Sequence, residues 1–161
     1  SVVWNLGGTA SYTSASNGLA SHFYGYERGT TVYSGHATTW TGKIGLMYPS
    51  DYGYATAGGS TTNRSTCLTT TMGNWNGTGV TDCKNNDYLY HRDFPWTLAP
   101  FSSDARHVFF VYSAGDVHNG YASDVHSVRP AAYLKSDILL SGVGDGSSTL
   151  PYQFLLTDSF S

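Results

Sequence analysis

Short apolar segments separated by turn residues recur along this chain, most regularly in its second half. Each segment is rich in β-branched, leucine or aromatic residues, and glycine, proline, serine or asparagine lies near its ends. Turn residues at intervals of roughly eight to twelve positions are typical of a meander or a barrel-like sheet. The pattern predicts short strands at residues 1–4, 30–33, 43–48, 88–90, 96–98, 108–112, 115–117 and 128–134.

Residues 55–82 show almost no apolar periodicity and consist mostly of glycine, threonine, asparagine and serine. A stretch of this length without secondary structure is unusual in a compact domain, so we expect it to be functional or held in place. A disulfide between Cys67 and Cys83 would hold it. Because the chain has no C-x-x-C motif, zinc and thioredoxin-type chemistry are disfavoured, whereas two free buried thiols stay open as an alternative.

Signals for helices are weak, and we expect one or two short helices within the first ninety residues. The predicted fold class is therefore α+β, mostly β and rich in loops. Neither a linker nor an internal repeat divides the 161 residues, so we expect a single domain over residues 1–161. No apolar run is long enough for a transmembrane helix, and we expect any export signal or membrane anchor to lie outside this chain.

Aromatic residues are abundant in this chain, and charged residues are scarce. It has 13 tyrosines, 7 phenylalanines and 4 tryptophans, whereas charged residues make up 12% of it. The eight lysines and arginines are scattered singly and the net charge is −3, which argues against nucleic acid as a partner. Serine, threonine, asparagine and tyrosine supply most of the polar groups, so we expect an extracellular protein.

Motifs for catalysis, cofactors and metals are largely absent from the sequence. It has no G-x-S-x-G nucleophile motif, no P-loop and no G-x-G-x-x-G dinucleotide motif. A single glutamate excludes a glycosidase with two glutamates but leaves an aspartate pair, such as Asp104 and Asp116, open. His107, His118 and His126 would hold zinc only if they converged, and their spacing follows no known ligand pattern. We therefore expect no enzyme, no cofactor and no bound metal.

The tryptophans and phenylalanines divide between expected core and expected surface. Trp4, Trp40 and Trp96 lie among apolar neighbours, so we assign their rings to the core. Phe109 and Phe110 cannot both point inward, because neighbouring side chains of a strand face opposite sides. We expect one of them in the core and the other on a second packed face or on the exposed surface.

Arg129 stands in the segment Val-Arg-Pro at residues 128–130. A guanidinium carries five N–H donors, which suits it to satisfying the carbonyl groups of neighbouring loops. We expect this structural role for Arg129, and direct contact with a ligand is the alternative.

The order of several motifs resembles a family of bacterial surface domains. Their counterparts in this chain are W-x-L-x-P at 96–100, V-F-F-V at 108–111, G-x-V at 115–117 and V-R-P-x-x-x-L at 128–134. Ser127 stands where that family typically has a glycine. Residues 27–55 resemble members found downstream of prepilin-type leaders in Gram-positive and related bacteria. The resemblance extends over most of residues 23–155.

Such domains are similar to the C-type-lectin-like variable proteins of diversity-generating retroelements. This resemblance implies a C-type-lectin-like fold in which the N- and C-terminal strands pair and a central β-ribbon presents side chains to a ligand. Adenine-directed mutagenesis of those proteins favours Tyr, Asn, Asp, Ser, His, Gly, Ala and Phe. Residues 101–107 and 116–127 consist almost wholly of these types. We therefore expect a diversified display segment at residues 101–127, with an ordinary exposed polar loop as the alternative.

The function that follows is an extracellular ligand-binding or adhesion module that recognises a protein or glycan on another cell or host surface. Tyrosine supplies a large contact area with few rotatable bonds, and small polar residues adapt their hydrogen bonds to the target. The expected ligand-binding residues are Arg106, His107, Tyr112, Asp116, His118, Asn119, Tyr121, Asp124 and His126. The alternatives are a structural pilin-like subunit of a pilus or other surface assembly, and a phage receptor-binding protein on a virion surface.

Overall fold

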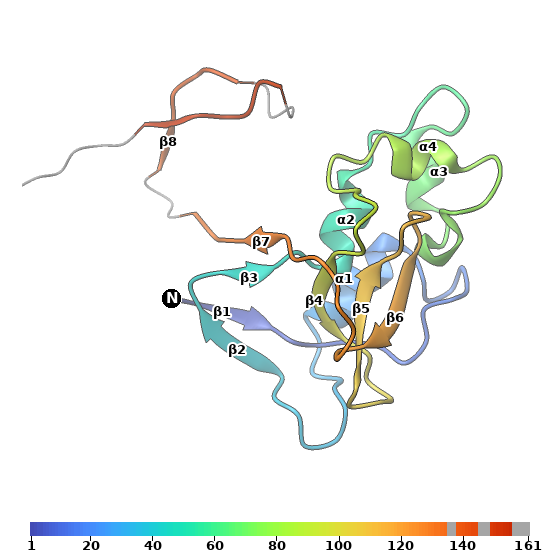
Figure 1. Ribbon diagram of the computed structural model, residues 1–161, viewed down its shortest axis with the longest axis vertical. Coiled ribbons are helices and arrows are strands. Elements are labelled where there is room, and N and C mark those ends of the chain that lie inside the picture. Colours follow the sequence, from blue (N-terminus) through green and yellow to red (C-terminus); the bar gives the residue numbers. More distant parts are fainter. Residues whose placement is uncertain (135–137, 145–148, 156–161) are drawn as a thin grey trace, which may run out of the picture.

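The computed structural model describes residues 1–134, 138–144 and 149–155. Its elements, in chain order, are β1 (Val2–Asn5), α1 (Ala20–Glu27), β2 (Thr39–Gly42), β3 (Gly45–Leu46), α2 (Pro49–Ala55), α3 (Arg64–Leu68), the 3-10 helix η1 (Met72–Asn74), α4 (Thr81–Asn85), β4 (Trp96–Pro100), β5 (His107–Val111), β6 (Val117–Tyr121), β7 (Pro130–Ala131), β8 (Leu139–Leu140) and β9 (Phe154–Leu155). The expected class, α+β with mostly strands and loops, is confirmed (Figure 1). Within the described ranges, four α-helices replace the one or two that we expected.

A three-stranded antiparallel sheet of β4, β5 and β6 lies against α1 and α2 (Figure 1). The main core fills the space between them. Phe109 of β5 meets Phe23 of α1 edge-on at 5.1 Å between ring centroids and Tyr12 at 4.9 Å. Tyr52 of α2 is fully buried beside Trp75 and donates a hydrogen bond of 2.6 Å to the carbonyl of Gly115. Helices and sheet are thus joined by ring packing and by a buried hydroxyl.

The two larger helices pack closely because small residues separate them. A Cβ atom at Gly53 of α2 would lie 2.6 Å from the Cβ of Ala20 and 2.4 Å from the Met72 sulfur. Glu27, at the end of α1 and fully buried, accepts a hydrogen bond of 2.8 Å from the backbone N–H of Ser50 and another from its hydroxyl. The carboxyl group therefore satisfies one backbone N–H group that the first turn of α2 leaves open.

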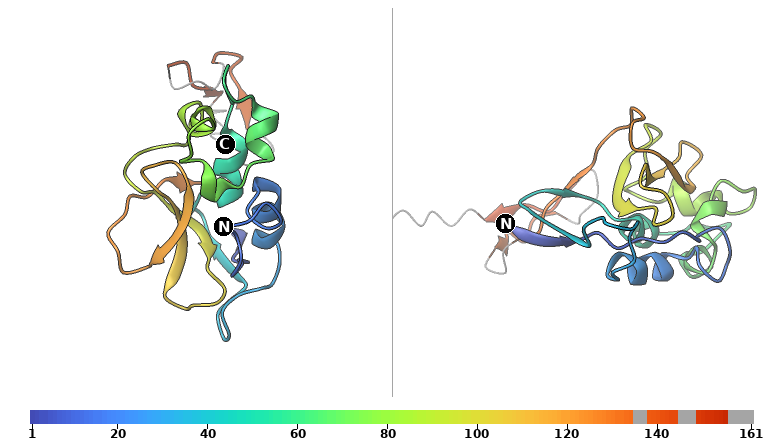
Figure 2. Two further views of the ribbon diagram at one scale, coloured as in Figure 1. Left: turned by 90° about the vertical axis from the view of Figure 1, so that its right-hand side faces the viewer. Right: turned by 90° about the horizontal axis from the view of Figure 1, so that it is seen from below.

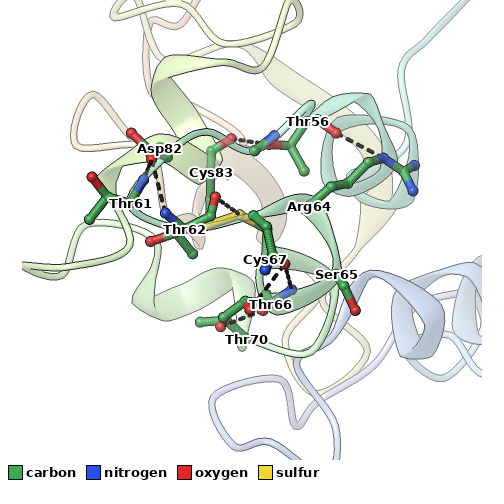
Figure 3. The surroundings of a disulfide bond; sticks show 12 residues. Thr56, Thr61, Thr62, Arg64, Ser65, Thr66, Cys67, Thr70, Asp82 and Cys83 are labelled. Carbon is green, nitrogen blue, oxygen red and sulfur yellow. Dashed lines mark hydrogen bonds between the residues drawn. A yellow bond between two sulfur atoms is a disulfide. The ribbon is translucent and has the colours of Figure 1, made fainter.

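The polar stretch 55–82 is held in place by the expected disulfide. Cys67 of α3 and Cys83 of α4 are bonded, with their Cα atoms 5.4 Å apart (Figure 3). Around the bond, Asp82 accepts hydrogen bonds from the backbone of Thr61 and Thr62, at 2.8 and 2.9 Å. The stretch is more ordered than we expected, because side-chain caps and the disulfide stabilise short helical turns where no apolar periodicity marks them.

The edge of the domain departs from the strand pairing that the resemblance implies. Within the described residues, β1 pairs with β2 and β3 pairs with β7, so the first strand is not joined to a C-terminal one. Trp4 and Trp40 stand opposite each other in the β1–β2 pair, but only Trp4 is buried. Trp40 is 46% exposed, which corrects its assignment to the core. Its ring lies over Gly42 at the rim instead.

Two further predicted strands are absent because local hydrogen bonds form turns there. Residues 30–33 form no strand, and in residues 88–90 the backbone turns around Asp87. The carboxyl oxygen Oδ1 of Asp87 accepts from the N–H of Leu89 at 2.8 Å, and its carbonyl accepts from Tyr90 at 3.1 Å. Aspartate favours such turns, since its side chain competes with strand pairing for backbone donors.

We predict that the stability of the fold falls as the pH rises from about 4.5 to about 7. Burial raises the pKa of Glu27 from 4.5 to about 7, although hydrogen bonds from Ser50 and the charge of Arg28 act in the opposite direction. Between these values the folded chain holds a proton that the unfolded chain releases, so folding becomes less favourable by about 3 kcal/mol over the window. The free energy of unfolding in urea, measured at several pH values, checks this.

The matched control is Glu27→Gln, which keeps the size of the side chain and its hydrogen bond from the Ser50 N–H. Between pH 4.5 and 7 the variant should lose most of the Glu27 contribution to the pH dependence. Asp87, whose pKa burial raises to about 8, continues to lower stability up to that pH in both proteins. Equal pH dependence in the two proteins over this window would contradict the prediction.

Candidate functional site

The hairpin of β5 and β6 decides which of the predicted site residues share a face. Antiparallel pairing places Phe110 opposite His118 and Phe109 opposite Asn119. Because side chains alternate along a strand, Phe109 and Asn119 face the core, whereas Phe110 and His118 face away from it. Both phenylalanines are buried, and only Phe109 belongs to the main core. The expectation that the other would lie on a second packed face is confirmed.

Ring side chains gather on the face of the sheet that points away from the core, and we call them the outer-face cluster. Its members are Phe94, Trp96, Phe110, Tyr112, His118 and His126. His126 stacks on Trp96 with ring centroids 4.2 Å apart and meets Phe110 edge-on at 4.5 Å. The segment after β6 is further held by a hydrogen bond of 2.9 Å from the Trp96 N–H to the carbonyl of Ser127. It therefore returns beside β4 and completes the cluster.

The rings of this cluster are fixed by one another, and its rim is open to solvent. Tyr112 is 43% exposed and His118 is exposed, while Phe94, Trp96 and His126 are half-buried. Phe94 has a φ of +56°, a left-handed conformation that is uncommon for a bulky side chain. Its ring packs on Tyr112 at 5.2 Å and on His126 at 5.5 Å, and these contacts hold the unusual backbone in place.

A second group, which we call the edge cluster, lies at the end of the hairpin where β5 begins and β6 ends. It consists of Asp104, Arg106, His107 and Tyr121. Arg106 donates hydrogen bonds of 3.1 and 3.0 Å to the two carboxylate oxygens of Asp104, and these hold the pKa of Asp104 well below its usual range. The Tyr121 ring lies 4.4 Å from the His107 ring and 5.4 Å from the Arg106 guanidinium. The cluster presents an exposed charge beside a half-exposed aromatic ring.

A polar pocket of about 270 Å³ lies beside η1 where β6 begins, and His118 of the outer-face cluster also lines it. Tyr12, Asn74 and Asp116 line it. Asp116 is only 6% exposed, and its Oδ1 has no hydrogen-bond partner among the described residues. Nearby, Tyr12 donates a hydrogen bond of 2.5 Å to the Oδ1 of Asn119, and burial raises the pKa of its hydroxyl.

The structure thus divides the predicted ligand-binding residues instead of uniting them on one face. Tyr112, His118 and His126 lie in the outer-face cluster, Arg106, His107 and Tyr121 in the edge cluster, Asp116 in the pocket beside η1, Asn119 on the core side of β6, and Asp124 in the exposed turn after β6. The placement of Asp116 corrects the expectation that it is displayed. The turn at Gly115, with a φ of +96°, directs the chain into β6 so that this carboxyl is buried.

The two alternatives based on chemistry find no support in this arrangement. The five residues of β5, which span roughly 16 Å, separate Asp104 from Asp116, whereas paired carboxyls of glycosidases lie about 5 to 10 Å apart. His107 faces the opposite side of the sheet from His118. Over the ranges that the structure describes, no group of three or more His, Cys, Asp or Glu side chains could hold a metal ion.

Sequence reasoning missed several residues of these sites. Phe94 carries no periodic signal, since it precedes the strand that begins at Trp96. Trp96 was assigned to the core but belongs to the outer-face cluster and is half-buried. Tyr12 stands alone in a stretch of small polar residues, and only the packing of β6 brings it beside Asn119. A strict application of strand alternation to residues 107–112 would have separated the two faces.

Comparisons of the chain with protein-family models, with curated proteins and with solved structures found no match. Among the residues whose placement is described, no helix is long and apolar enough to cross a membrane. The protein is therefore characterised by its own fold and by the side chains on its surface. It is a disulfide-bonded α+β domain with an aromatic and imidazole-rich face on its main sheet.

We predict that two aromatic substitutions distinguish a ring that stabilises the fold from a ring that is exposed on the surface. Trp96→Ala should lower the free energy of unfolding by about 3 kcal/mol, because it removes the ring on which His126 and Phe110 pack. Tyr121→Ala should lower it by less than about 1 kcal/mol, since this ring is 46% exposed. Urea unfolding of both variants checks this. Equal losses would show that Tyr121 belongs to the packed structure.

Proposed function

We propose that this protein is an extracellular ligand-binding or adhesion module whose outer-face and edge clusters contact a protein or glycan on another cell. The observation that carries the proposal is the outer-face cluster. There the exposed Tyr112 and His118 pack on the Phe110 ring, which in turn packs against Trp96 and His126. Contact surfaces of this kind favour tyrosine, tryptophan and arginine.

Rigidity of the aromatic rings supports a role in binding. A side chain that is already fixed loses little conformational entropy when a partner covers it, so more of the contact energy remains as affinity. Beside the fixed rings, the turn after β6 carries small polar side chains. This turn is open to solvent, since Val125 within it is 99% exposed. The combination of rigid rings with adaptable polar neighbours is the one that antibody loops use.

The compartment follows from the disulfide together with the polar surface. Disulfides persist in oxidising environments and are rare in the cytosol, so the bond between Cys67 and Cys83 is compatible with an extracellular protein. Placement on a cell surface or a pilus is part of the proposal and is supported by the resemblance in sequence. In this proposal, attachment to the membrane depends on a segment outside this chain.

A structural subunit of a pilus or another surface assembly is the second candidate, and one observation favours it. The hairpin of β8 and β9 exposes four large apolar side chains, each about half exposed. They are Leu139, Leu140, Phe154 and Leu155. Exposed apolar groups that lie together mark interaction surfaces, and an adjoining subunit in an assembly would cover them.

Diversification would restrict variation to certain positions of the segment 101–127. Sequencing this locus in sibling strains should show substitutions at exposed sites such as Tyr112, His118 and Tyr121. The buried positions Phe109 and Val117 should stay apolar, because their side chains form the core. Variation spread evenly over the whole chain, or confined to other loops, would contradict the diversified display segment.

The binding proposal predicts that Tyr112→Ala and His118→Ala each weaken attachment of the labelled protein to target cells or to an arrayed glycan by about tenfold. Both side chains are exposed, so the melting temperature should change little. Tyr152→Ala is the matched control, because Tyr152 is 54% exposed and lies outside both clusters. Binding that survives both substitutions, or that falls equally in the control, would show that the outer-face cluster is not the contact surface.

A further inference from the structure

A cleft of about 760 Å³ lies between α2, residues 88–93 and residues 128–131, and we call it the α2 cleft. Figure 2 shows these segments from two further sides. Sites for small ligands typically measure about 300–1,000 Å³, so the α2 cleft is large enough for one. It shares no residue with the outer-face cluster or the edge cluster, which makes it a separate site.

Arg129 lines this cleft, and its guanidinium makes no hydrogen bond or ion pair with the residues that the structure describes. The Nε atom is buried without a partner. The backbone on both sides is fixed, by the hydrogen bond between Trp96 and Ser127 and by the pairing of β7 with β3. The structural role expected of Arg129, satisfying loop carbonyls, is therefore not observed. The buried Nε is closed to a ligand, but the two terminal nitrogens make no hydrogen bond to the described residues, and together they can bind a carboxylate through two parallel hydrogen bonds.

The buried carboxyl group that influences Arg129 does not neutralise it. Asp87, which precedes the cleft residue Tyr88 in the chain, is 6% exposed and has an Oδ2 without a hydrogen-bond partner in the described part of the chain. Burial raises the pKa of Asp87 to about 8, against the effect of the Arg129 charge. Most Asp87 side chains are consequently protonated at neutral pH, and the positive charge of Arg129 stays available to an anionic ligand.

The remaining lining of the cleft indicates what else the ligand carries. Tyr24, Tyr54 and Tyr88 expose their rings at its border, with Tyr88 72% exposed. The C–H face of a sugar ring packs well on such aromatic surfaces. The carboxyl groups of Asp51 and Asp93 also line the cleft, where they can accept hydrogen bonds from hydroxyl groups. These two acidic groups oppose any anion, so the cleft favours a group with a single negative charge, bound at Arg129, over a phosphate group with up to two.

We propose that the α2 cleft binds a sugar that carries a carboxylate, such as a sialic acid or a hexuronic acid residue. The carboxylate of the sugar binds the Arg129 guanidinium, a ring face packs on the tyrosines, and hydroxyl groups donate to Asp51 or Asp93. A neutral sugar lacks the group that the open guanidinium requires.

Isothermal titration of the full chain with sialyllactose, a hyaluronan tetrasaccharide and lactose tests this inference. At least one of the two acidic sugars should bind, and lactose, which is sialyllactose without its acidic residue, should bind about 10- to 100-fold more weakly. The first two probes distinguish a sialic acid from a hexuronate. Equal binding of lactose, or no binding of either acidic sugar, overturns the proposal.

Substitutions locate the binding. Arg129→Gln should weaken binding of the acidic sugar about 10- to 100-fold, whereas Arg92→Gln, which removes an exposed positive charge next to Asp93 but outside the lining of the cleft, should have no effect. If Arg129→Gln lowers the melting temperature, the exposed Tyr88→Ala variant decides in its place by a loss of affinity. Tyr112→Ala should leave acidic-sugar binding unchanged, so failure here is distinct from failure of the outer-face cluster. Full affinity in both cleft variants overturns the inference.

Discussion

Alternation of side chains along β5 is the constraint on which both the core and the outer-face cluster depend. Phe109 must enter the core, where it contacts the rings of Phe23 and Tyr12. Its neighbour Phe110 is consequently directed to the other face, where it supports His126 and lies opposite His118. A shift of the register by one residue would exchange the two faces completely. The position of the aromatic surface is therefore fixed by the burial of residues on the opposite face of the sheet.

The two surfaces that we propose for binding differ in their physics. In the outer-face cluster the rings are packed on one another, so its contribution to affinity comes from contact area that is already ordered. In the α2 cleft a positive charge is fixed with its donors open, so its contribution comes from a specific charged group on the ligand. Adhesion to a cell surface can use both, because the first suits a large partner and the second selects a small chemical group. The two surfaces share no residue, so a substitution in one surface leaves the residues of the other unchanged.

The sequence predicted correctly those elements whose formation depends on residues that are neighbours in the chain. Strands β4 and β5 lie where β-branched and aromatic residues occur between turn residues, and the paired cysteines hold the polar stretch between them. Helices α3 and α4 were not foreseen, since they are five residues long and are held by the disulfide, together with the Asn63 cap at the start of α3. Trp40 and Trp75 show that the burial of a side chain was equally hard to predict from its neighbours in the chain. Trp40 has apolar neighbours in sequence but lies at the rim, whereas Trp75, in a polar sequence, is fully buried against Tyr52.

By itself, the sequence determined the class of the fold, and it favoured a disulfide between the two cysteines and a display segment rich in tyrosine, histidine and small polar residues. These depend on composition and on periodicity over a few residues, which a chain carries in any conformation. Only the tertiary structure decided that Asp116 turns inward, that Phe94 joins the aromatic face and that Arg129 lines a cleft with its donors open. Each of these depends on contacts between segments far apart in the chain. Such contacts are selected by the packing of the whole domain, and no local pattern records them.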